Sequence, residues 1–243
     1  MWPQWIVVGL ACVSLGVAIG FHGRPYTGNV SFWRVLGERA ILMWLLYMGG
    51  FFTPAHAQTP PPQAARYRLM LLREAQSQWG LGAPVAALAA QVHAESSWRP
   101  NAVSRAGAKG MAQFMPATAA WWCELTGAAQ DDCLPHNPAW ALRAMVGYDF
   151  HLFQRAPAWL GDYDRLWLAL RGYNGGEANW QAEALATGQD APTRAQIDAA
   201  CGKARRAPVH CAENLSYPRR ILLDLQPLYA AWGALWEPLE PPQ

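Results

Sequence analysis

The sequence from Pro84 to Ser97 reads PVAALAAQVHAESS and decides the fold class. Proline suits the first turn of a helix, so we expect a helix to open at Pro84. One apolar face then follows at the i, i+3, i+4, i+7 spacing of a helix, and its members are Val85, Leu88, Ala89 and Val92. Three residues further along this face stands Glu95, an acid where a core residue belongs.

Glu95 is the first candidate for chemistry. Burial disfavours the charged form of a carboxyl, so an acid at the end of an apolar face is expected to have a raised pKa. A carboxyl that stays partly protonated near neutrality is the state that a general acid needs. The turn that follows, from Ser96 to Asn101, is expected to place this carboxyl at the lip of a cleft. The alternative is a solvated or paired surface acid, which is the commoner fate of a carboxylate at a helix end.

The rest of the chain after Gln58 also predicts helices, because β-branched alternation is rare and Ala, Leu, Arg and Gln dominate. We therefore expect a mainly α fold. Besides the helix at Pro84, the predicted helices are 64–79, 117–125, 138–153 capped by Asn137, 165–173, 177–186 and 214–232, the last with Pro218 in its first turn. Six large apolar side chains are expected in the core: Trp98, Met115, Trp121, Trp122, Trp140 and Trp167.

Composition and charge exclude several classes of protein. Of 243 residues, 52% are hydrophobic and 15% are charged, which excludes general disorder. Residues 1–57 hold three of the 19 basic and one of the 17 acidic residues, so 16 of each remain after them. A neutral body without a dense Lys/Arg cluster lacks the electrostatic footprint of phosphate binding, so no nucleic-acid partner is expected.

Residues 1–57 contain two apolar segments. The first, from Trp5 to Phe21, is close to the length of a membrane helix, and the second, from Ala40 to Ala57, ends in a small-x-small pattern. The basic loop between them is expected to stay in the cytoplasm, so the second segment would export everything after it. We favour a signal peptide cleaved after Ala57; the alternatives are an uncleaved membrane hairpin and a later start of translation.

Cysteine usage agrees with export to an oxidising compartment. Apart from Cys12, four cysteines form two pairs of equal spacing, and four cysteines allow three connectivities. Short loops close at the least entropic cost, so the local pairs Cys123 with Cys133 and Cys201 with Cys211 are the expected disulfides. Unpaired thiols are the alternative. A zinc site is not expected, because neither pair has Cys-x-x-Cys spacing.

Three later segments, in order, carry a resemblance. Gly110-Met111-Ala112-Gln113, Gly172-Tyr173-Asn174-Gly175-Gly176 and Glu213 with Tyr217 follow Glu95-Ser96. Here the chain, from about Ala64 to Tyr229, resembles the soluble lytic transglycosylase family, enzymes with a lysozyme-like fold that cleave peptidoglycan glycan strands. It departs from the family motifs in small ways: Met111-Ala112 stands where Leu-Met is usual, and Gly172 and Gly175 replace alanines.

The resemblance implies a reaction in which one carboxyl makes both proton transfers. Glu95 would protonate the oxygen that links N-acetylmuramic acid (MurNAc) to N-acetylglucosamine (GlcNAc). It would then take the proton of the sugar's own 6-hydroxyl as that oxygen closes onto C1, which gives a 1,6-anhydro ring. The substrate's acetamido group can stabilise the developing charge, so neither a nucleophilic Asp nor a metal or other cofactor is expected.

By the same resemblance, supporting residues surround the catalytic glutamate. Gln113 would hold the N-acetyl group, Ser104 would lie near the catalytic carboxyl, and Tyr173 would press on the sugar or steady Glu95. For these residues the alternative roles are helix capping and core packing. The full expected substrate-binding set is Ser96, Ser104, Gln113, Tyr173, Asn174, Glu213 and Tyr217.

Two other functions stay open. A hydrolytic muramidase of the same fold would need a second carboxylate to activate water, and the available acids are Asp131, Asp132, Asp149 and Glu177. A non-catalytic cell-wall-binding or assembly module would keep its biological effect after Glu95→Gln. His93-Ala94-Glu95 also resembles the His-x-Glu of zinc deaminases, but no Pro-Cys-x-x-Cys follows it.

The expected organisation is a membrane and signal-like segment at 1–57, a Pro-rich linker at 58–63, a catalytic domain at 64–232 and a Pro-rich tail at 233–243. The expected partner is the peptidoglycan glycan strand, with the membrane added if residues 1–57 are retained. The expected location is the periplasm or the periplasmic face of the inner membrane. A role beside a secretion, conjugation or phage apparatus is one of several that remain open.

Overall fold

The computed structural model describes residues 59–238, which are taken here by themselves. The expectations for the apolar segments at 1–57, for Cys12 and for the end of the Pro-rich tail lie outside this part. Residues 59–238 are mainly helical and hold two isolated bridges but no strand, which confirms the mainly α prediction. No helix in this range is long and apolar enough to cross a membrane.

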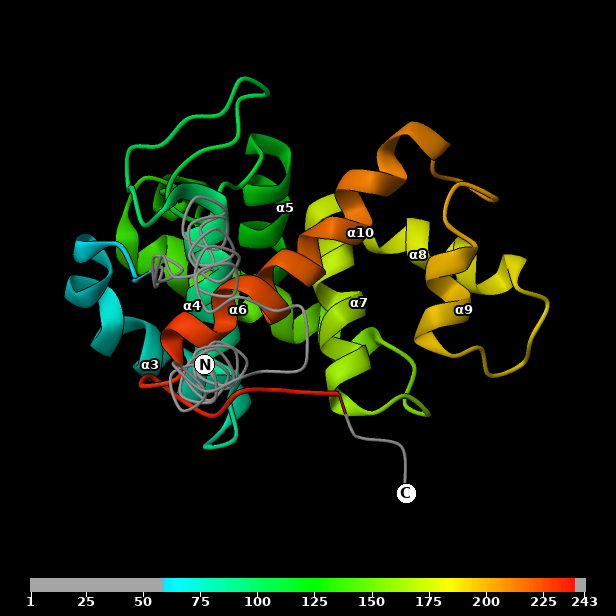
Figure 1. The fold of residues 1–243 in the computed structure, drawn as a ribbon. Helices are drawn as coiled ribbons and strands as arrows, with labels where there is room; N and C mark the ends of the chain where they lie inside the picture. The colour runs from blue at the N-terminus through cyan, green and yellow to red at the C-terminus, as the bar shows by residue number, and fades with distance from the viewer. Residues whose placement is uncertain (1–58, 239–243) are drawn as a thin grey trace, which may run out of the picture. The chain divides into compact units, whose positions relative to one another are not determined.

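The helices are labelled in Figure 1. The α-helices are α3 (Arg68–Trp79), α4 (Val85–Ser96), α5 (Pro116–Thr126), α6 (Pro138–Arg155), α7 (Asp162–Gly175), α8 (Glu177–Ala186), α9 (Arg194–Ala199) and α10 (Cys211–Arg219). The short 3₁₀-helices are η1 (Pro62–Tyr67), η2 (Gln130–Asp132), η3 (Pro208–His210) and η5 (Gln226–Tyr229), and η4 (Arg220–Leu225) is a π-helix.

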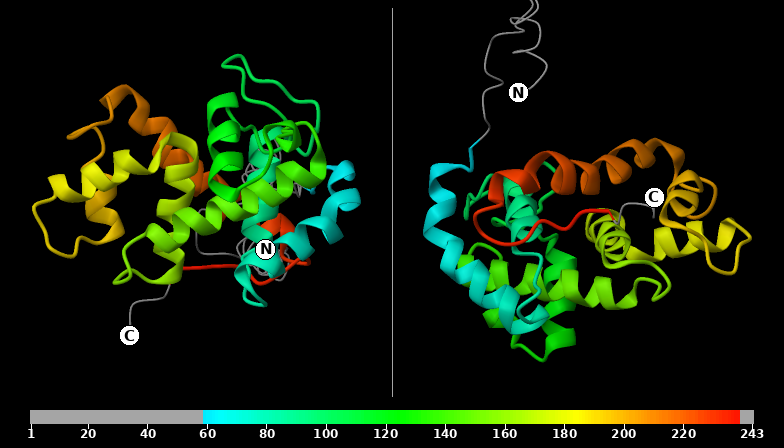
Figure 2. Two further views of the ribbon diagram at one scale, coloured as in Figure 1. Left: turned by 180° about the vertical axis from the view of Figure 1, so that it is seen from behind. Right: turned by 60° about the horizontal axis from the view of Figure 1, so that its bottom comes forward.

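Helix α4 is the centre of the core. Every residue from Val85 to Val92 is buried, including Gln91, so the helix is covered on all sides and not only on the predicted apolar face. It packs against α3 on one side and against η4 and η5 on the other. Helices α6 and α7 pack against each other. Helix α7 also packs against α8 and α10 (Figure 1). The views of Figure 2 place α8 and α9 on the far side of α7 from α3.

The N-cap of α6 forms as predicted. The side chain of Asn137 accepts hydrogen bonds from the backbone N–H groups of Ala139 and Trp140, at 2.9 and 3.3 Å. These bonds satisfy two of the donors that a helix start leaves free. Helix α9, by contrast, was not predicted, although Thr193 and Gln196 form a capping box at its start. The Thr-x-x-Gln pattern is the sequence signal that would have located it.

The prediction of a single α-helix at 214–232 is wrong. The chain from 214 to 232 is not one α-helix, because α10 starts at Cys211 and gives way to π-helix η4 and then to η5. Pro218 therefore lies inside α10 and not in its first turn. Proline has no N–H to donate to the carbonyl four residues before it, and its ring crowds that carbonyl. The wider turns of η4 follow directly after this disturbed turn.

Two of the six predicted core side chains are exposed. Trp98 is fully buried, and Trp122 and Trp167 are nearly so. Met115 and Trp121 are each 42% exposed, which contradicts the prediction for both. Met115 is the N-cap residue of α5 and so lies at the end of a surface helix. The ring of Trp121 meets Tyr148 edge-on with centroids 5.6 Å apart, so it packs on the surface of α6 and not beneath it.

Two disulfides close the loops around this core. Cys123 of α5 is joined to Cys133 just after η2, and Cys201 after α9 is joined to Cys211 at the start of α10. These are the two local pairs that the equal spacing predicts. The second disulfide fixes the start of α10 next to the end of α9, and α10 carries two of the predicted site residues.

Candidate active site

Glu95 lies in the last turn of α4, where the buried helix reaches the surface. The chain then turns sharply, and Ser97 and Trp98 both have positive φ, at 52° and 65°. Such a conformation is strained for residues with a side chain and is maintained only by its surroundings. Here the buried indole of Trp98 donates to the Tyr229 hydroxyl at 2.8 Å, which anchors the turn in the core. Glu95 is therefore partly exposed at the end of a rigid helix.

The carboxyl of Glu95 has one hydrogen-bond partner from a distant helix. The hydroxyl of Tyr217, on α10, donates to its Oε1. Burial raises the pKa of Glu95 to about 7, although the Tyr217 hydrogen bond and the positive charge of Arg220 both act to lower it. The side chain is thus close to half protonated at neutral pH, so it can give up a proton and take one back.

Ser96 and Tyr173 both hold the loop that carries the Gly110–Gln113 motif. The Ser96 hydroxyl donates to the Met111 carbonyl at 2.8 Å and accepts from the Arg99 N–H at 3.1 Å. The Tyr173 hydroxyl, at the end of α7, donates to the Ala112 carbonyl at 2.6 Å. Two of the predicted substrate-binding residues therefore fix the position of the loop beside Glu95.

Gln113 keeps one polar atom free. Its backbone has a positive φ of 51°, and its side-chain nitrogen donates to the Gly110 carbonyl at 2.8 Å and, at 3.4 Å, to that of Ala102. No hydrogen bond within residues 59–238 reaches its Oε1. This geometry leaves an acceptor for a ligand N–H group, such as the amide of an N-acetyl group.

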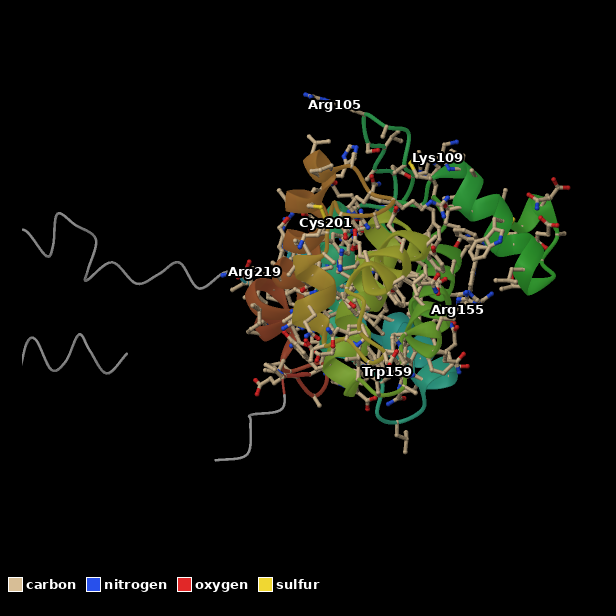
Figure 3. The ribbon with its side chains drawn as sticks, turned by 90° about the vertical axis from the view of Figure 1, so that its right-hand side faces the viewer. Arg105, Lys109, Arg155, Trp159, Cys201 and Arg219 are labelled. Carbon is tan, nitrogen blue, oxygen red and sulfur yellow. A yellow bond between two sulfur atoms is a disulfide. The ribbon has the colours of Figure 1, made fainter. Side chains whose placement is uncertain are left out.

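Ser104 does not contact Glu95 through a hydrogen bond. Its hydroxyl accepts from the Ala108 N–H at 3.0 Å, inside the same loop, which ties the turn at Gly107. The neighbouring Arg105 marks the tip of this loop and points away from the body (Figure 3). The Ser104 hydroxyl thus stabilises a turn of its own loop, a role that was not among the expected ones.

Neither Asn174, near the end of α7, nor Glu213, on α10, forms a hydrogen bond with Glu95 within residues 59–238. The Oδ1 of Asn174 accepts from the buried amide of Asn214 at 3.1 Å. The side chain of Glu213 is exposed and lines a cavity together with Asn174. Since Glu213 and Tyr217 are four residues apart on one helix, both project from the same face of α10.

A buried charged network behind Asn174 escaped the sequence analysis. Arg171, which is fully buried, donates to Asn214 and Asp198, both at 2.9 Å, and to Glu183. Arg206 also donates to Glu183, at 3.0 Å. The network joins α7, α8, α9 and α10, and buried charges need such partners. The sequence signal for a buried charge was Arg171, which directly follows the apolar residues 166–170. Its partners could not be identified from the sequence, because they lie 12 to 43 residues further along the chain.

The four acids considered for water activation differ in their surroundings. Asp149 is fully buried, Gln91 donates to its Oδ1 at 3.2 Å, and burial raises its pKa well above the ordinary value. Its carboxyl is therefore shielded from water. Both oxygens of Glu177 accept from the guanidinium of Arg155, at 2.7 and 2.8 Å. Asp131 and Asp132 are exposed in η2. None of the four is hydrogen-bonded to Glu95.

Among residues 59–238, no three His, Cys, Asp or Glu side chains come together closely enough to hold an ion.

Comparisons with known proteins identify relatives of this chain. A membrane-bound lytic murein transglycosylase F from Alteromonas mediterranea is 32% identical over 102 residues, which are 42% of this chain and 20% of that protein. The chain thus spans about a fifth of that relative's length.

Solved structures show the same fold. The 70 kDa soluble lytic transglycosylase of Escherichia coli matches with a TM-score of 0.50 and 17% identity, over 92% of this chain and 30% of that one. An inactive mutant of the lytic transglycosylase Slt from Pseudomonas aeruginosa matches with a TM-score of 0.51 and 20% identity, over 88% of this chain and 34% of that one. The transglycosylase SLT domain family matches residues 70–194, about half of the sequence, so the chain belongs to this family.

Proposed function

We propose that this protein is a peptidoglycan lytic transglycosylase, which cleaves the β-1,4 bond between MurNAc and GlcNAc and leaves 1,6-anhydro-MurNAc ends. The observation that carries the proposal is Glu95 itself: a carboxyl with a pKa of about 7, at the open end of a buried helix, with the Tyr217 hydroxyl on one oxygen. The family of the chain and the expected chemistry of its motifs support the same reaction.

In the first step, the protonated Glu95 gives its proton to the bridging oxygen, and the bond from that oxygen to C1 of MurNAc breaks. In the second step, the Glu95 carboxylate takes the proton of the C6 hydroxyl as the C6 oxygen bonds to C1. The carboxyl ends protonated, as it began, and no water is consumed. A pKa near the working pH suits both steps, because neither protonation state is costly to reach.

Other residues have supporting roles in this proposal. The free Oε1 of Gln113 accepts the acetamido N–H, which leaves the acetamido oxygen to stabilise the charge that develops at C1. Ser96 and Tyr173 position the Gly110–Gln113 loop through their hydrogen bonds to Met111 and Ala112. Asn174 and Glu213 line one cavity and would contact parts of the substrate other than the cleaved bond.

The mass of the products tests the reaction. Purified sacculi digested by the wild-type protein are expected to release fragments with anhydro ends, each lighter by one water than the product of hydrolysis. Hydrolysed ends would instead assign the protein as a muramidase of the same fold. Undigested sacculi that retain the protein would favour the non-catalytic wall-binding module.

The substrate sets the proposed location and organisation. Peptidoglycan lies outside the cytoplasmic membrane, so we propose that the domain at 64–232 works in the periplasm. Two disulfides are consistent with that compartment. The segment at 1–57 would export the domain and, if retained, anchor it to the membrane.

Removal of the Tyr217 hydroxyl is expected to shift the pH dependence of cleavage upward. The hydroxyl stabilises the charged form of Glu95, so its loss in Tyr217→Phe raises the pKa of the acid further. The high-pH limb of kcat/KM, measured on soluble glycan oligomers, should move up by roughly one pH unit. Tyr163→Phe, which removes a hydroxyl at the start of α7, is the control and should leave the profile in place. A limb that stays fixed or moves down in Tyr217→Phe contradicts the proposed contact.

A further inference from the structure

A cavity of about 330 Å³ opens beside Asn174, on the wall of α10 that also carries Tyr217. Its lining includes both polar and charged side chains, among them Asn174, Asn179, Arg205, Arg206, His210 and Glu213. Glu213 and Tyr217 are one helical turn apart, which is about 5 to 6 Å along the helix. The cavity is thus about one turn of α10 away from the residue that contacts the catalytic carboxyl.

Arg206 is the unusual member of this lining. Its side chain is only 5% exposed, and its Nε donates to Glu183 at 3.0 Å. Neither of its terminal nitrogens donates to any acceptor within residues 59–238, and Nη2 is buried as well as unpartnered. A buried donor without an acceptor is costly, and a guanidinium is best satisfied by a carboxylate that accepts from two of its N–H groups.

Gly175 is what allows Arg206 to occupy this position. A Cβ atom at Gly175 would lie 2.4 Å from Nη1 and 3.1 Å from Nη2 of Arg206, and 2.7 Å from the amide nitrogen of Asn214. Any side chain at position 175 would therefore exclude the Arg206 guanidinium from its present place. The glycine and the arginine thus depend on each other in this chain.

The charges around the cavity favour an anion. Glu183 and Asp198 do not line the cavity. Their charges are balanced in the buried network, Glu183 by Arg171 and Arg206 and Asp198 by Arg171 and Arg194. Among the residues that line the cavity, Arg205 and Arg206 are positively charged and Glu213 carries the one carboxylate. The described residues form no ion pair between Glu213 and either arginine. A ligand carboxylate would thus meet guanidinium groups whose terminal N–H groups are not already taken.

We propose that this cavity is a binding site for a carboxylate of the peptide attached to the substrate's muramic acid, with Arg206 as its main donor. This rests on the proposed function, since the peptide is carried by the sugar next to the cleaved bond. The peptide of an uncross-linked strand ends in a free carboxylate, and the cavity lies on the same face of α10 as the reacting centre. The site would make the enzyme prefer strands that carry charged peptides.

The test uses three soluble tetrasaccharides of alternating GlcNAc and MurNAc. The first carries peptides with free carboxylates, the second carries the same peptides with each carboxylate converted to a carboxamide, and the third has no peptide and keeps a free lactyl carboxylate. For the wild type, kcat/KM is expected to be about tenfold higher on the first than on the second or third. In Gly175→Ala and in Arg206→Gln this ratio is expected to fall to near one.

Lys203→Gln is the matched control, because it removes one positive charge from the same exposed loop outside the cavity, and its ratio should stay at the wild-type value. Circular dichroism of each variant is the check that it is folded. Gly175→Ala displaces the Arg206 guanidinium and Arg206→Gln removes it, so the two variants test the same group in different ways.

Equal wild-type cleavage of the first two tetrasaccharides would overturn the carboxylate site and leave the proposed function standing. Efficient cleavage of the third with the same sensitivity to Gly175→Ala would assign the cavity to the lactyl group and overturn the peptide assignment. No cleavage of any of the three by the wild type would overturn the proposed function and this inference with it.

Discussion

Glu95→Gln is expected to reduce the release of fragments from sacculi by at least about a thousandfold. Glutamine has the shape of the acid and can still accept the Tyr217 hydrogen bond, but it has no proton to give to the bridging oxygen. Binding to sacculi should be retained, which separates lost chemistry from lost recognition. Glu124→Gln, at an exposed position of α5, is the matched control and should release fragments at the wild-type rate. A Glu95→Gln protein that still releases anhydro-sugars would contradict the assigned role.

The same substitution is expected to stabilise the fold at neutral pH. The pKa of Glu95 is about 7 in the folded protein against 4.5 for an ordinary glutamate, so the folded state binds more protons between these values. Wild-type stability therefore falls as pH rises from about 4.5 to about 7, and glutamine removes this loss. Because Glu95 is partly exposed, we expect a gain of about 2 kcal/mol at pH 8 and little at pH 4. Urea unfolding at both pH values measures it; a variant less stable than wild type at pH 8 would count against a desolvated acid.

Gly110→Ala is expected to destabilise the protein by more than about 4 kcal/mol, or to prevent folding. A Cβ at this position would lie 1.7 Å from the carbonyl oxygen of Pro135 and 2.6 Å from its carbonyl carbon. Both are backbone atoms and cannot rotate away. The backbone φ of +77° at Gly110 adds strain for any residue with a side chain. The Gly110–Gln113 loop would therefore have to leave its place beside Glu95.

Gly107→Ala is the matched control for this effect. Gly107 lies in the same loop and has a positive φ of 89°, but a Cβ there would meet nothing within 4 Å. It should cost only about 1 kcal/mol, from backbone strain alone. Urea unfolding of the two variants separates the collision with Pro135 from the strain. Equal losses in the two would show that the packing of Gly110 against Pro135 is not what holds the loop.

The parts of the site that were predictable are those with local sequence signals. The periodicity of the apolar residues in α4 was enough to predict that Glu95 lies on its buried face near the helix end. The position of Asn137 before Pro138 was enough to predict that its side chain caps α6. Spacing also gave the two disulfide pairs. In each of these cases, the residues that interact lie within about one turn or one short loop of each other.

The parts that escaped prediction depend on residues far apart in the chain. The Tyr217 hydroxyl reaches Glu95 across 122 positions, and the Arg171 guanidinium reaches Asn214 across 43. Periodicity shows which residues share a face of a helix, but not whether another helix covers that face. For this reason, the prediction that Trp121 is buried was wrong. For the same reason, Asp149 could not be distinguished from an exposed acid, although it is fully buried against Gln91.

The titration of the Glu95 side chain tests the central claim most directly. Carbon-13 NMR of the folded protein labelled at glutamate Cδ, with Glu95→Gln to assign the signal, follows this one carboxyl through pH. We predict a midpoint near pH 7, because burial outweighs the Tyr217 hydrogen bond and the charge of Arg220. A midpoint below about pH 5 would mean that Glu95 is an ordinary ionised glutamate, and it would contradict the proposal that this residue is the proton donor.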